Sequence, residues 1–158
     1  AEVLTHEPSL TSPANGVTTV ADGSVTFEGV SFKYSERAEE NALSDIDLRI
    51  DSGSTLGIVG GTGSSKTSLI QLICRLYDVS EGSVKVGGRD VRDYDLSSLR
   101  DAVSVVLQKN VLFSGTIKDN MRWGNPEATD EQIVRACELA QADEFIQQLP
   151  GVAPHLNV

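Results

Sequence analysis

Apolar and polar residues alternate along residues 24–50, and a period of two predicts strands with one buried side and one exposed side. The phase of the alternation changes at Glu28-Gly29, and a phase change at a glycine predicts a β-bulge. The polar residues 35–41 separate the first run from the second. The apolar positions are Val25, Phe27, Val30, Phe32, Tyr34, Ile46, Leu48 and Ile50. The two runs therefore predict a pair of half-buried, antiparallel-type strands.

Two shorter runs are apolar throughout, which is typical of strands buried inside a parallel sheet. Residues 56–59 lead through a glycine-rich turn into an apolar helix from Lys66 onward. Residues 103–107 follow a helical turn that Asp95 caps. Between these runs, Gly87-Gly88 predicts a β-hairpin. Together the patterns predict an α/β fold, in which an antiparallel β layer lies beside a core with parallel strands.

The last third of the chain has helical patterns. Thr129 and Gln132 have the spacing of a capping box, and apolar residues recur after them at helical spacing. A shorter helix follows and is predicted to stop at Pro150-Gly151. Residues 109–123, before these helices, are unusually apolar for a loop region. This segment either packs on its own domain or forms a surface that a partner protein covers.

Residues 1–22 mix Pro, Gly, Ser, Thr and Asn without apolar periodicity, which predicts a linker or a poorly ordered arm. A linker implies a preceding domain. The remaining 136 positions, 23–158, are long enough for one domain with a sizeable core. His6 and His155 have no partner at ligand spacing, and Cys74 and Cys137 fit buried thiols better than metal ligands.

Composition and charge narrow the classes of function. The chain is 39% hydrophobic and 23% charged, which is ordinary for a globular protein. A net charge of −10 without clustered Lys or Arg argues against a nucleic-acid partner. No apolar run approaches the roughly 20 residues that cross a bilayer, so we expect the chain itself to be soluble.

The strand–turn–helix at residues 54–76 has the chemistry of a phosphate-binding loop. The turn consists of Gly60, Gly61, Thr62, Gly63, Ser64 and Ser65. Backbone N–H groups in such a turn face an anion, and the start of the next helix adds unpaired N–H groups. Lys66 supplies a full positive charge, and the hydroxyl of Thr67 can hold Mg²⁺. The alternative is a Gly/Ser turn followed by an incidental lysine.

Ser65 departs from the phosphate-loop pattern, which has glycine at that position. A β-carbon there hinders close approach of the backbone to phosphate, and a positive φ would cost about 1–3 kcal/mol. A second polar candidate is Gln108, which directly follows the apolar run 103–107. Ligands bind at the carboxyl ends of parallel strands, so Gln108 is a candidate contact for a γ-phosphate or a metal ion.

Several strings in this order resemble the nucleotide-binding domain of ATP-binding-cassette (ABC) transporters of the exporter type. They are VTFEGVSFKY, IVGGTGSSKTSLIQLICRLYDVSEGSV, VVLQKNVLFSGTIKDN and PEATDEQIVRACELAQADEFIQQLP. The third string is the most specific, since generic P-loop proteins have no reason to carry it. The resemblance implies a P-loop NTPase-like core with the start of a helical subdomain.

The resemblance also implies roles for individual residues. Tyr34 would stack on adenine, or it simply finishes a strand. Residues 60–65 and Ser68 would bind the nucleotide, and Lys66 would contact the β- and γ-phosphates of ATP. Thr67 would bind Mg²⁺, and Gln108 would reach the metal and the attacking water. Lys66 and Gln108 would therefore be the catalytic residues.

The parent protein implied by this resemblance is an ATPase at the cytoplasmic face of a cell membrane that powers export. Its partners would be a transmembrane domain and a second nucleotide-binding domain. The 158 residues hold no L-S-G-G-Q signature and no apolar strand ending in Asp-Glu, so we expect this chain to lack ATPase activity. Two alternatives stay open. One is an ABC domain that binds nucleotide without hydrolysis, and the other is a soluble ABC ATPase outside transport.

Overall fold

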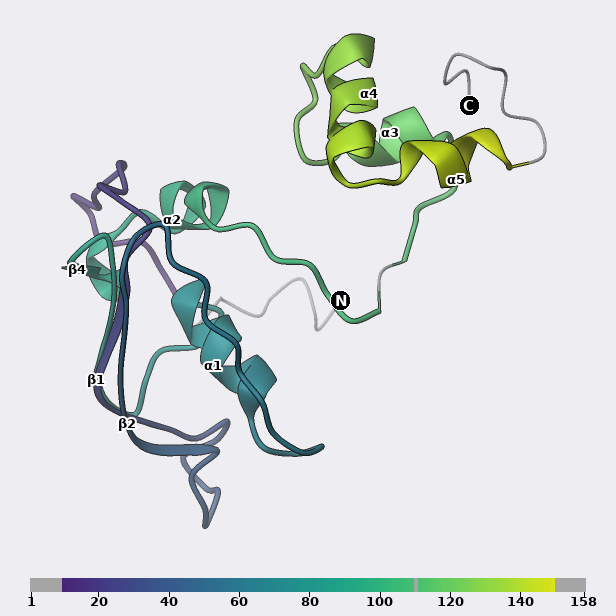
Figure 1. Ribbon diagram of the computed structural model, residues 1–158. Coiled ribbons are helices and arrows are strands. Elements are labelled where there is room, and N and C mark those ends of the chain that lie inside the picture. Colours follow the sequence, from purple (N-terminus) through teal and green to yellow (C-terminus); the bar gives the residue numbers. More distant parts are fainter. Residues whose placement is uncertain (1–9, 110, 150–158) are drawn as a thin grey trace, which may run out of the picture. The chain divides into compact units, whose positions relative to one another are not determined.

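The computed structural model describes residues 10–109 and 111–149, drawn in colour in Figure 1. The chain divides into two compact units, Ala1–Val105 and Val106–Val158. The first contains a β-sheet with its covering helices, and the regular elements in the described part of the second are all helices.

The first unit is built on a four-stranded antiparallel sheet with the order β2-β1-β3-β4. Its strands are β1 (Val25–Phe32), β2 (Leu43–Ile50), β3 (Glu81–Val86) and β4 (Arg89–Asp90). The predicted antiparallel layer is thus confirmed. On β2, Ile46, Leu48 and Ile50 are half-buried, whereas the residues between them are exposed. This is the alternation that the sequence predicted.

The predicted bulge lies in β1. Pairing with β2 shifts register between Phe27 and Val30, and Gly29 has a φ of 53°. Gly82 of β3 approaches the bulge so closely that a β-carbon there would lie 2.3 Å from the carbonyl oxygen of Glu28. A side chain at residue 82 is therefore excluded by sterics as well as by its φ of 80°.

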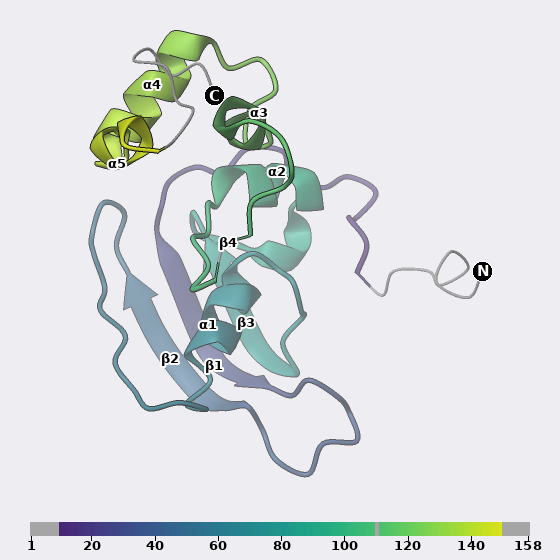
Figure 2. The same cartoon turned by 90° about the vertical axis from the view of Figure 1, so that its right-hand side faces the viewer.

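Helix α1 (Lys66–Ile73) lies across one face of the sheet, as Figure 2 shows. Leu69 and Leu72 of α1 pack in one core with residues of the strands. The core also includes Leu99 of α2 (Leu96–Ala102) and Val91 of the 3₁₀ helix η2 (Val91–Asp93). The predicted cap is confirmed, because the Asp95 carboxylate accepts a hydrogen bond from the Ser98 N–H at 3.0 Å.

Residues 10–22 are held against the first unit, so the prediction of a poorly ordered arm was wrong for this segment. The N–H of Val17 donates to the carbonyl of Asp93, and the N–H of Asp95 donates to the carbonyl of Val17. The Ser12 hydroxyl donates to the Asp95 carboxylate at 3.0 Å. Val17 also packs against the core. A few backbone bonds and small apolar contacts hold the segment without any periodic pattern in its sequence.

The described part of the second unit has three short helices, α3 (Ile117–Arg122), α4 (Asp130–Leu139) and α5 (Asp143–Gln147). Its core is formed by Ile133, Cys137 and Ile146. The predicted capping box of Thr129 and Gln132 is present. The predicted stop at Pro150-Gly151 lies outside the described residues. Helix α3 was not predicted. It begins in the apolar segment, with its own capping box at Thr116 and Asp119.

Two strand predictions were wrong: neither residues 56–59 nor residues 103–107 form a strand. Val59 and Val106 are 98% and 90% exposed. A strand requires hydrogen bonds to a neighbouring strand, and the sheet of the described residues consists of β1 to β4 alone. The apolar pattern alone therefore did not decide whether a strand forms, because within residues 10–109 and 111–149 neither run pairs with another strand.

No helix in residues 10–109 and 111–149 combines the length and the apolar character that crossing a bilayer requires.

Candidate functional site

Two glycines of the loop between residues 60 and 65 differ in their surroundings. A β-carbon on Gly60 would lie 2.6 Å from the Ser64 hydroxyl, so a side chain there would require that hydroxyl to move. Gly63 has open space around it but a φ of 83°, a conformation that L residues rarely adopt. The predicted turn is therefore present and is closed by the Ser64 hydroxyl, which donates to the Gly61 carbonyl at 2.9 Å.

Ser65 is the N-cap of α1 and has left-handed backbone angles, φ 57° and ψ 22°. Its side chain makes no capping hydrogen bond. The position is thus one where glycine is favoured, and the serine is held there at a cost of the order of 1 kcal/mol. Ser65 therefore has the positive φ that the sequence analysis considered for this position.

The ammonium group of Lys66 lies over the loop. It donates to the carbonyl of Gly61 at 2.7 Å, to that of Gly60 at 2.8 Å and to the Ser64 hydroxyl at 3.0 Å. These acceptors are neutral, and no ion pair is described for Lys66 within residues 10–109 and 111–149. A cation held by three oxygen acceptors in a loop is well placed to exchange them for phosphate oxygens.

A cavity of about 320 Å³ joins this loop to Tyr34. Its lining consists of Tyr34, Gly63, Ser64, Ser65, Lys66, Thr67 and Ser68. The first N–H groups of α1 have no acceptor within the helix, so the cavity combines a positive side chain with unpaired backbone donors. The structure thereby brings together an aromatic side chain and an anion-binding loop that lie about 30 positions apart in the sequence.

Tyr34 is fixed at both ends of its side chain. Its ring meets Phe32 and Tyr77 edge-on, with centroids 4.8 and 5.2 Å apart. Its hydroxyl lies 2.6 Å from the Ser68 hydroxyl and donates to the side-chain oxygen of Gln71 at 3.3 Å. Tyr34 is nevertheless 53% exposed, so much of its surface is open to a ligand.

Gln71 and Tyr77 were not recognised from the sequence as parts of this site. A signal for Gln71 does exist, since it stands three residues after Ser68 and therefore on the same side of α1. Tyr77 has no comparable signal, because its contact with Tyr34 depends on the path of the chain after the helix.

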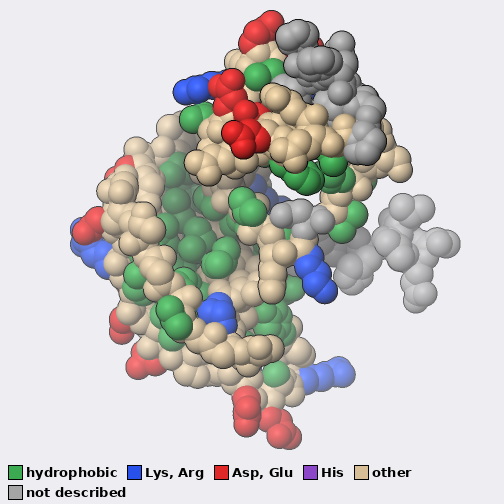
Figure 3. All heavy atoms as spheres, turned by 45° about the vertical axis from the view of Figure 1, so that its right-hand side comes forward, with side chains coloured by type: hydrophobic (Ala, Val, Ile, Leu, Met, Phe, Trp, Pro, Cys, Tyr) green, Lys and Arg blue, Asp and Glu red, His purple; other side chains and the backbone are tan. Residues whose placement is uncertain are grey.

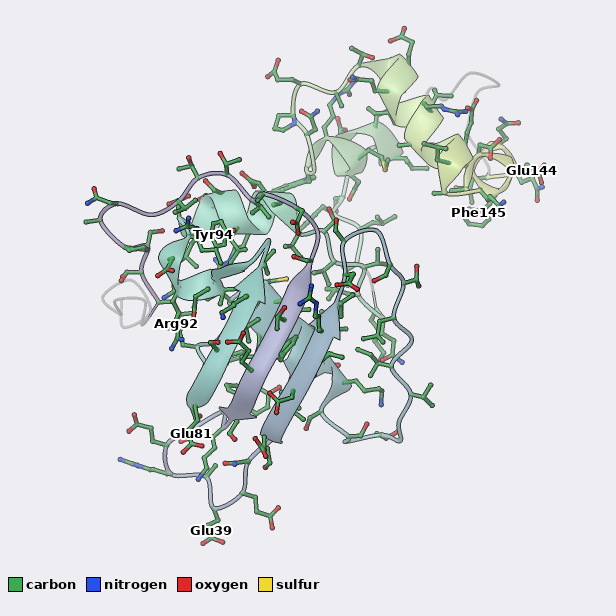
Figure 4. All side chains as sticks on the ribbon, turned by 60° about the vertical axis from the view of Figure 1, so that its left-hand side comes forward. Glu39, Glu81, Arg92, Tyr94, Glu144 and Phe145 are labelled. Carbon is green, nitrogen blue, oxygen red and sulfur yellow. The ribbon has the colours of Figure 1, made fainter. Side chains whose placement is uncertain are left out.

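A larger cavity of about 800 Å³ also includes Tyr34. Its charged lining residues are Lys33, Glu36, Asp78 and Glu81. Three carboxylates and one ammonium group repel a polyphosphate, so the smaller cavity is the better anion site despite its size. Figure 4 shows Glu81 at the end of β3 near the connecting loops.

Thr67, the residue predicted to hold Mg²⁺, lines the smaller cavity. The described residues contain no group of three His, Cys, Asp or Glu side chains that could hold a metal ion. Mg²⁺ commonly binds through one or two protein oxygens, with water and substrate phosphates completing its shell. A single hydroxyl beside a phosphate-binding loop fits that requirement.

Gln108 and Thr62 are not brought into this cavity by the described contacts. Gln108 belongs to the second unit, in irregular chain after residues 103–107. Thr62 is exposed in the turn. Their proposed roles therefore stay predictions.

The second unit carries a separate cluster of apolar side chains. Phe113 and Trp123 stack with their centroids 4.8 Å apart and remain 61% and 71% exposed. The side chain of Asn120 fixes the loop beneath them, because it accepts from the N–H of Phe113 and donates to the carbonyls of Phe113 and Thr116. Phe145 is also exposed, and Figure 4 shows it on α5. Figure 3 shows that hydrophobic side chains also reach the surface elsewhere in the described residues.

Comparison with known proteins decides the family. The sequence matches the ABC transporter family over residues 43–155. The chain belongs to this family. Among its ABC relatives, an uncharacterized ABC transporter ATP-binding protein of Bacillus subtilis is 41% identical over 149 residues. That alignment covers 94% of this chain and 24% of the relative. A multidrug efflux ATP-binding/permease protein of Mycobacterium tuberculosis is 42% identical over 149 residues, which are 94% of this chain and 12% of that protein.

The fold agrees with the family. The structure of a bacterial Atm1-family ABC exporter with ATP bound matches 99% of this chain with a TM-score of 0.86 and 30% identity. This confirms the predicted α/β fold of an ABC exporter's nucleotide-binding domain. This chain spans 27% of that exporter, 24% of the Bacillus subtilis relative and 12% of the Mycobacterium tuberculosis relative.

Proposed function

We propose that this chain binds Mg·ATP in the cavity between Tyr34 and the loop 60–68. The observation that carries the proposal is the shared lining of that cavity, in which an aromatic side chain, Lys66 and the start of α1 face one space. The aromatic ring suits a base, and the ammonium group with the backbone donors suits a triphosphate. The exporter of matching fold was solved with ATP bound, which supports the same ligand.

Each residue has a distinct task in this proposal. The ring of Tyr34 stacks on adenine. Lys66 leaves the carbonyls of Gly60 and Gly61 and pairs with phosphate oxygens, which gain a full charge in place of neutral partners. The Thr67 hydroxyl holds Mg²⁺, which neutralises phosphate charge when bound. Gln108 contacts the metal and the attacking water.

Isothermal titration calorimetry of the 158-residue chain with ATP and Mg²⁺ tests the proposed binding of Mg·ATP. We expect saturable binding in the millimolar range, weak because Ser65 occupies a position that suits glycine. Lys66→Ala should abolish measurable binding by removing the charge. Lys118→Ala is the matched control, because Lys118 pairs with Asp130 in the other unit. Absence of heat and saturation for the unmodified chain would contradict the proposal.

In the longer protein we propose a transport role. Residues 1–22 would link the domain at 23–158 to a preceding transmembrane domain, and the exposed pair Phe113 and Trp123 would lie on the side that meets it. A second nucleotide-binding domain would complete the ATP site. The protein would act at the cytoplasmic face of the cell membrane and hydrolyse ATP to power export. The multidrug efflux relative supports this placement.

For the chain alone we propose binding without hydrolysis. Phosphoryl transfer to water requires several parts at once, and the 158 residues hold neither the family's signature nor the acidic strand end that supplies a general base. A phosphate-release assay at saturating ATP should give the same rate for the chain and for Lys66→Ala. A faster release that Lys66→Ala removes would contradict this part and leave the binding proposal intact.

A further inference from the structure

We propose that Ser68 and Gln71 are positioning residues that hold the hydroxyl of Tyr34 and thereby set the place of the base relative to the phosphate loop. This rests on the proposed binding of ATP. It adds Gln71 to the site and changes the role of Ser68 from a phosphate contact to a support for the aromatic ring.

The hydrogen bonds form a directed chain. Tyr34 has one hydroxyl hydrogen, and it donates this to the side-chain oxygen of Gln71 at 3.3 Å. The Ser68 hydroxyl, 2.6 Å away, then donates to the Tyr34 oxygen. Both partners come from α1, the helix whose first turn carries Lys66 and Thr67. The ring and the phosphate-binding residues are thus tied to one rigid element.

Burial supports this role for Ser68. The residue is only 3% exposed, while its neighbour Thr67 is exposed. A hydroxyl that is buried and already paired with Tyr34 is less available to a phosphate than the N–H groups and the ammonium beside it. Phe32 and Tyr77 meet the ring edge-on, so they limit its position, whereas the hydroxyl bonds fix its direction.

The experiment compares ATP with inorganic tripolyphosphate, which has the phosphates but no base. Both are titrated with Mg²⁺ into the 158-residue chain and into Tyr34→Phe, Gln71→Met and Ser68→Ala. Gln71→Met keeps the length and the helix propensity of the side chain but removes the acceptor. Gln147→Met is the control, because it makes the same substitution at an exposed residue of α5 for which no contact with Tyr34 is described in residues 10–109 and 111–149.

We expect Gln71→Met and Ser68→Ala each to weaken ATP binding about threefold to tenfold, the effect of one lost hydrogen bond. Tyr34→Phe loses both bonds and should weaken ATP binding at least as much as either of them. Tripolyphosphate binding should stay unchanged in all three variants. Tyr34→Phe combined with Gln71→Met should weaken ATP no more than Tyr34→Phe alone, because both remove the same bond. Gln147→Met should bind both ligands as the unmodified chain does.

Three results would overturn the proposal: unchanged ATP affinity in Tyr34→Phe, additive losses in the double variant, or an equal loss of tripolyphosphate affinity in Ser68→Ala. The last would mean that Ser68 contacts phosphate directly. These results leave the proposed function standing as long as the unmodified chain binds ATP. If it binds neither ligand, the proposed function fails and this inference fails with it.

Discussion

The ammonium nitrogen of Lys66 lies 2.7 Å from the carbonyl oxygen of Gly61, so the cation of the phosphate loop is held by the loop's own backbone. A second bond of 2.8 Å joins it to Gly60. These bonds tie the Lys66 side chain to the turn. In the proposed binding of ATP, Lys66 exchanges these carbonyl acceptors for phosphate oxygens.

Ser65→Gly should stabilise the loop and tighten ATP binding. The serine has a φ of 57°, and its replacement by glycine removes a backbone strain of about 1 kcal/mol or more, partly offset by the greater freedom of glycine in the unfolded chain. Removal of the β-carbon also lets the backbone approach a phosphate more closely. Calorimetry with Mg·ATP and a thermal melt measure the two effects separately.

Ser65→Ala is the matched control for this prediction. It keeps the β-carbon and the strained φ while removing the hydroxyl, which makes no capping bond. We expect its melting temperature and ATP affinity to stay within error of the unmodified chain. If Ser65→Gly also leaves ATP affinity unchanged, the serine is accommodated and does not weaken the site.

The local elements were predictable because each has a short-range signal. The bulge at Gly29 follows from a change of phase, and the start of α4 follows from the Thr129 and Gln132 spacing. The loop at residues 60–65 follows from its glycines and Lys66. In all three cases the residues that give the sequence pattern are also the residues that form the bulge, the helix start or the loop.

Other features depend on neighbours that the sequence does not identify. The apolar runs 56–59 and 103–107 favour strands, but a strand forms only against another strand, and they have none among the described residues. The hydrogen bond from the Tyr34 hydroxyl to Gln71 joins two residues that lie far apart in the sequence, and only the fold brings them together. Gln108 cannot be placed from its position in the sequence alone, because the expected strand before it is absent.

Exposed apolar side chains should make the chain bind a hydrophobic fluorescent dye and self-associate. Val59 and Val106 are almost fully exposed, which is unusual for residues in strand-forming runs. The double variant Val59→Thr and Val106→Thr keeps the side-chain shapes and should lower dye binding without a change in the melting temperature. A monomeric chain that binds no dye would contradict this expectation.

Asn120→Ala should loosen the stacked pair Phe113 and Trp123. The amide side chain makes two bonds to the backbone of Phe113, at 2.7 and 2.9 Å. Their loss should destabilise the second unit by about 1–2 kcal/mol. Trp123 is the single tryptophan, so its fluorescence reports this unit selectively. We expect a red-shifted emission and faster quenching by acrylamide.

Gln147→Ala is the control for this prediction. Gln147 is exposed at the end of α5, and no side-chain hydrogen bond is described for it within residues 111–149. Its emission spectrum should match that of the unmodified chain. If Asn120→Ala gives the same spectrum and quenching as Gln147→Ala, the amide does not hold the aromatic pair.

Acid should destabilise the second unit through Asp130. Lys118 donates to its carboxylate at 2.6 Å, and Arg122 does so at the same distance. The hydrogen bond from Lys118, followed by that from Arg122, lowers the pKa of Asp130 below its usual value. Because the folded pKa is lower than the unfolded one, the stabilisation is present above about pH 4 and is lost as the pH falls further.

Urea unfolding followed by Trp123 fluorescence between pH 6 and pH 3 measures this loss. Asp130→Asn removes the titrating group, so its free energy of unfolding should fall less steeply below about pH 4 than that of the unmodified chain. Glu144→Gln is the matched control, since Glu144 lies exposed on α5 in Figure 4 and no ion pair is described for it in residues 111–149. If the free energy of unfolding falls equally steeply with pH in Asp130→Asn and in the unmodified chain, the ion pairs of Asp130 with Lys118 and Arg122 do not contribute to acid sensitivity.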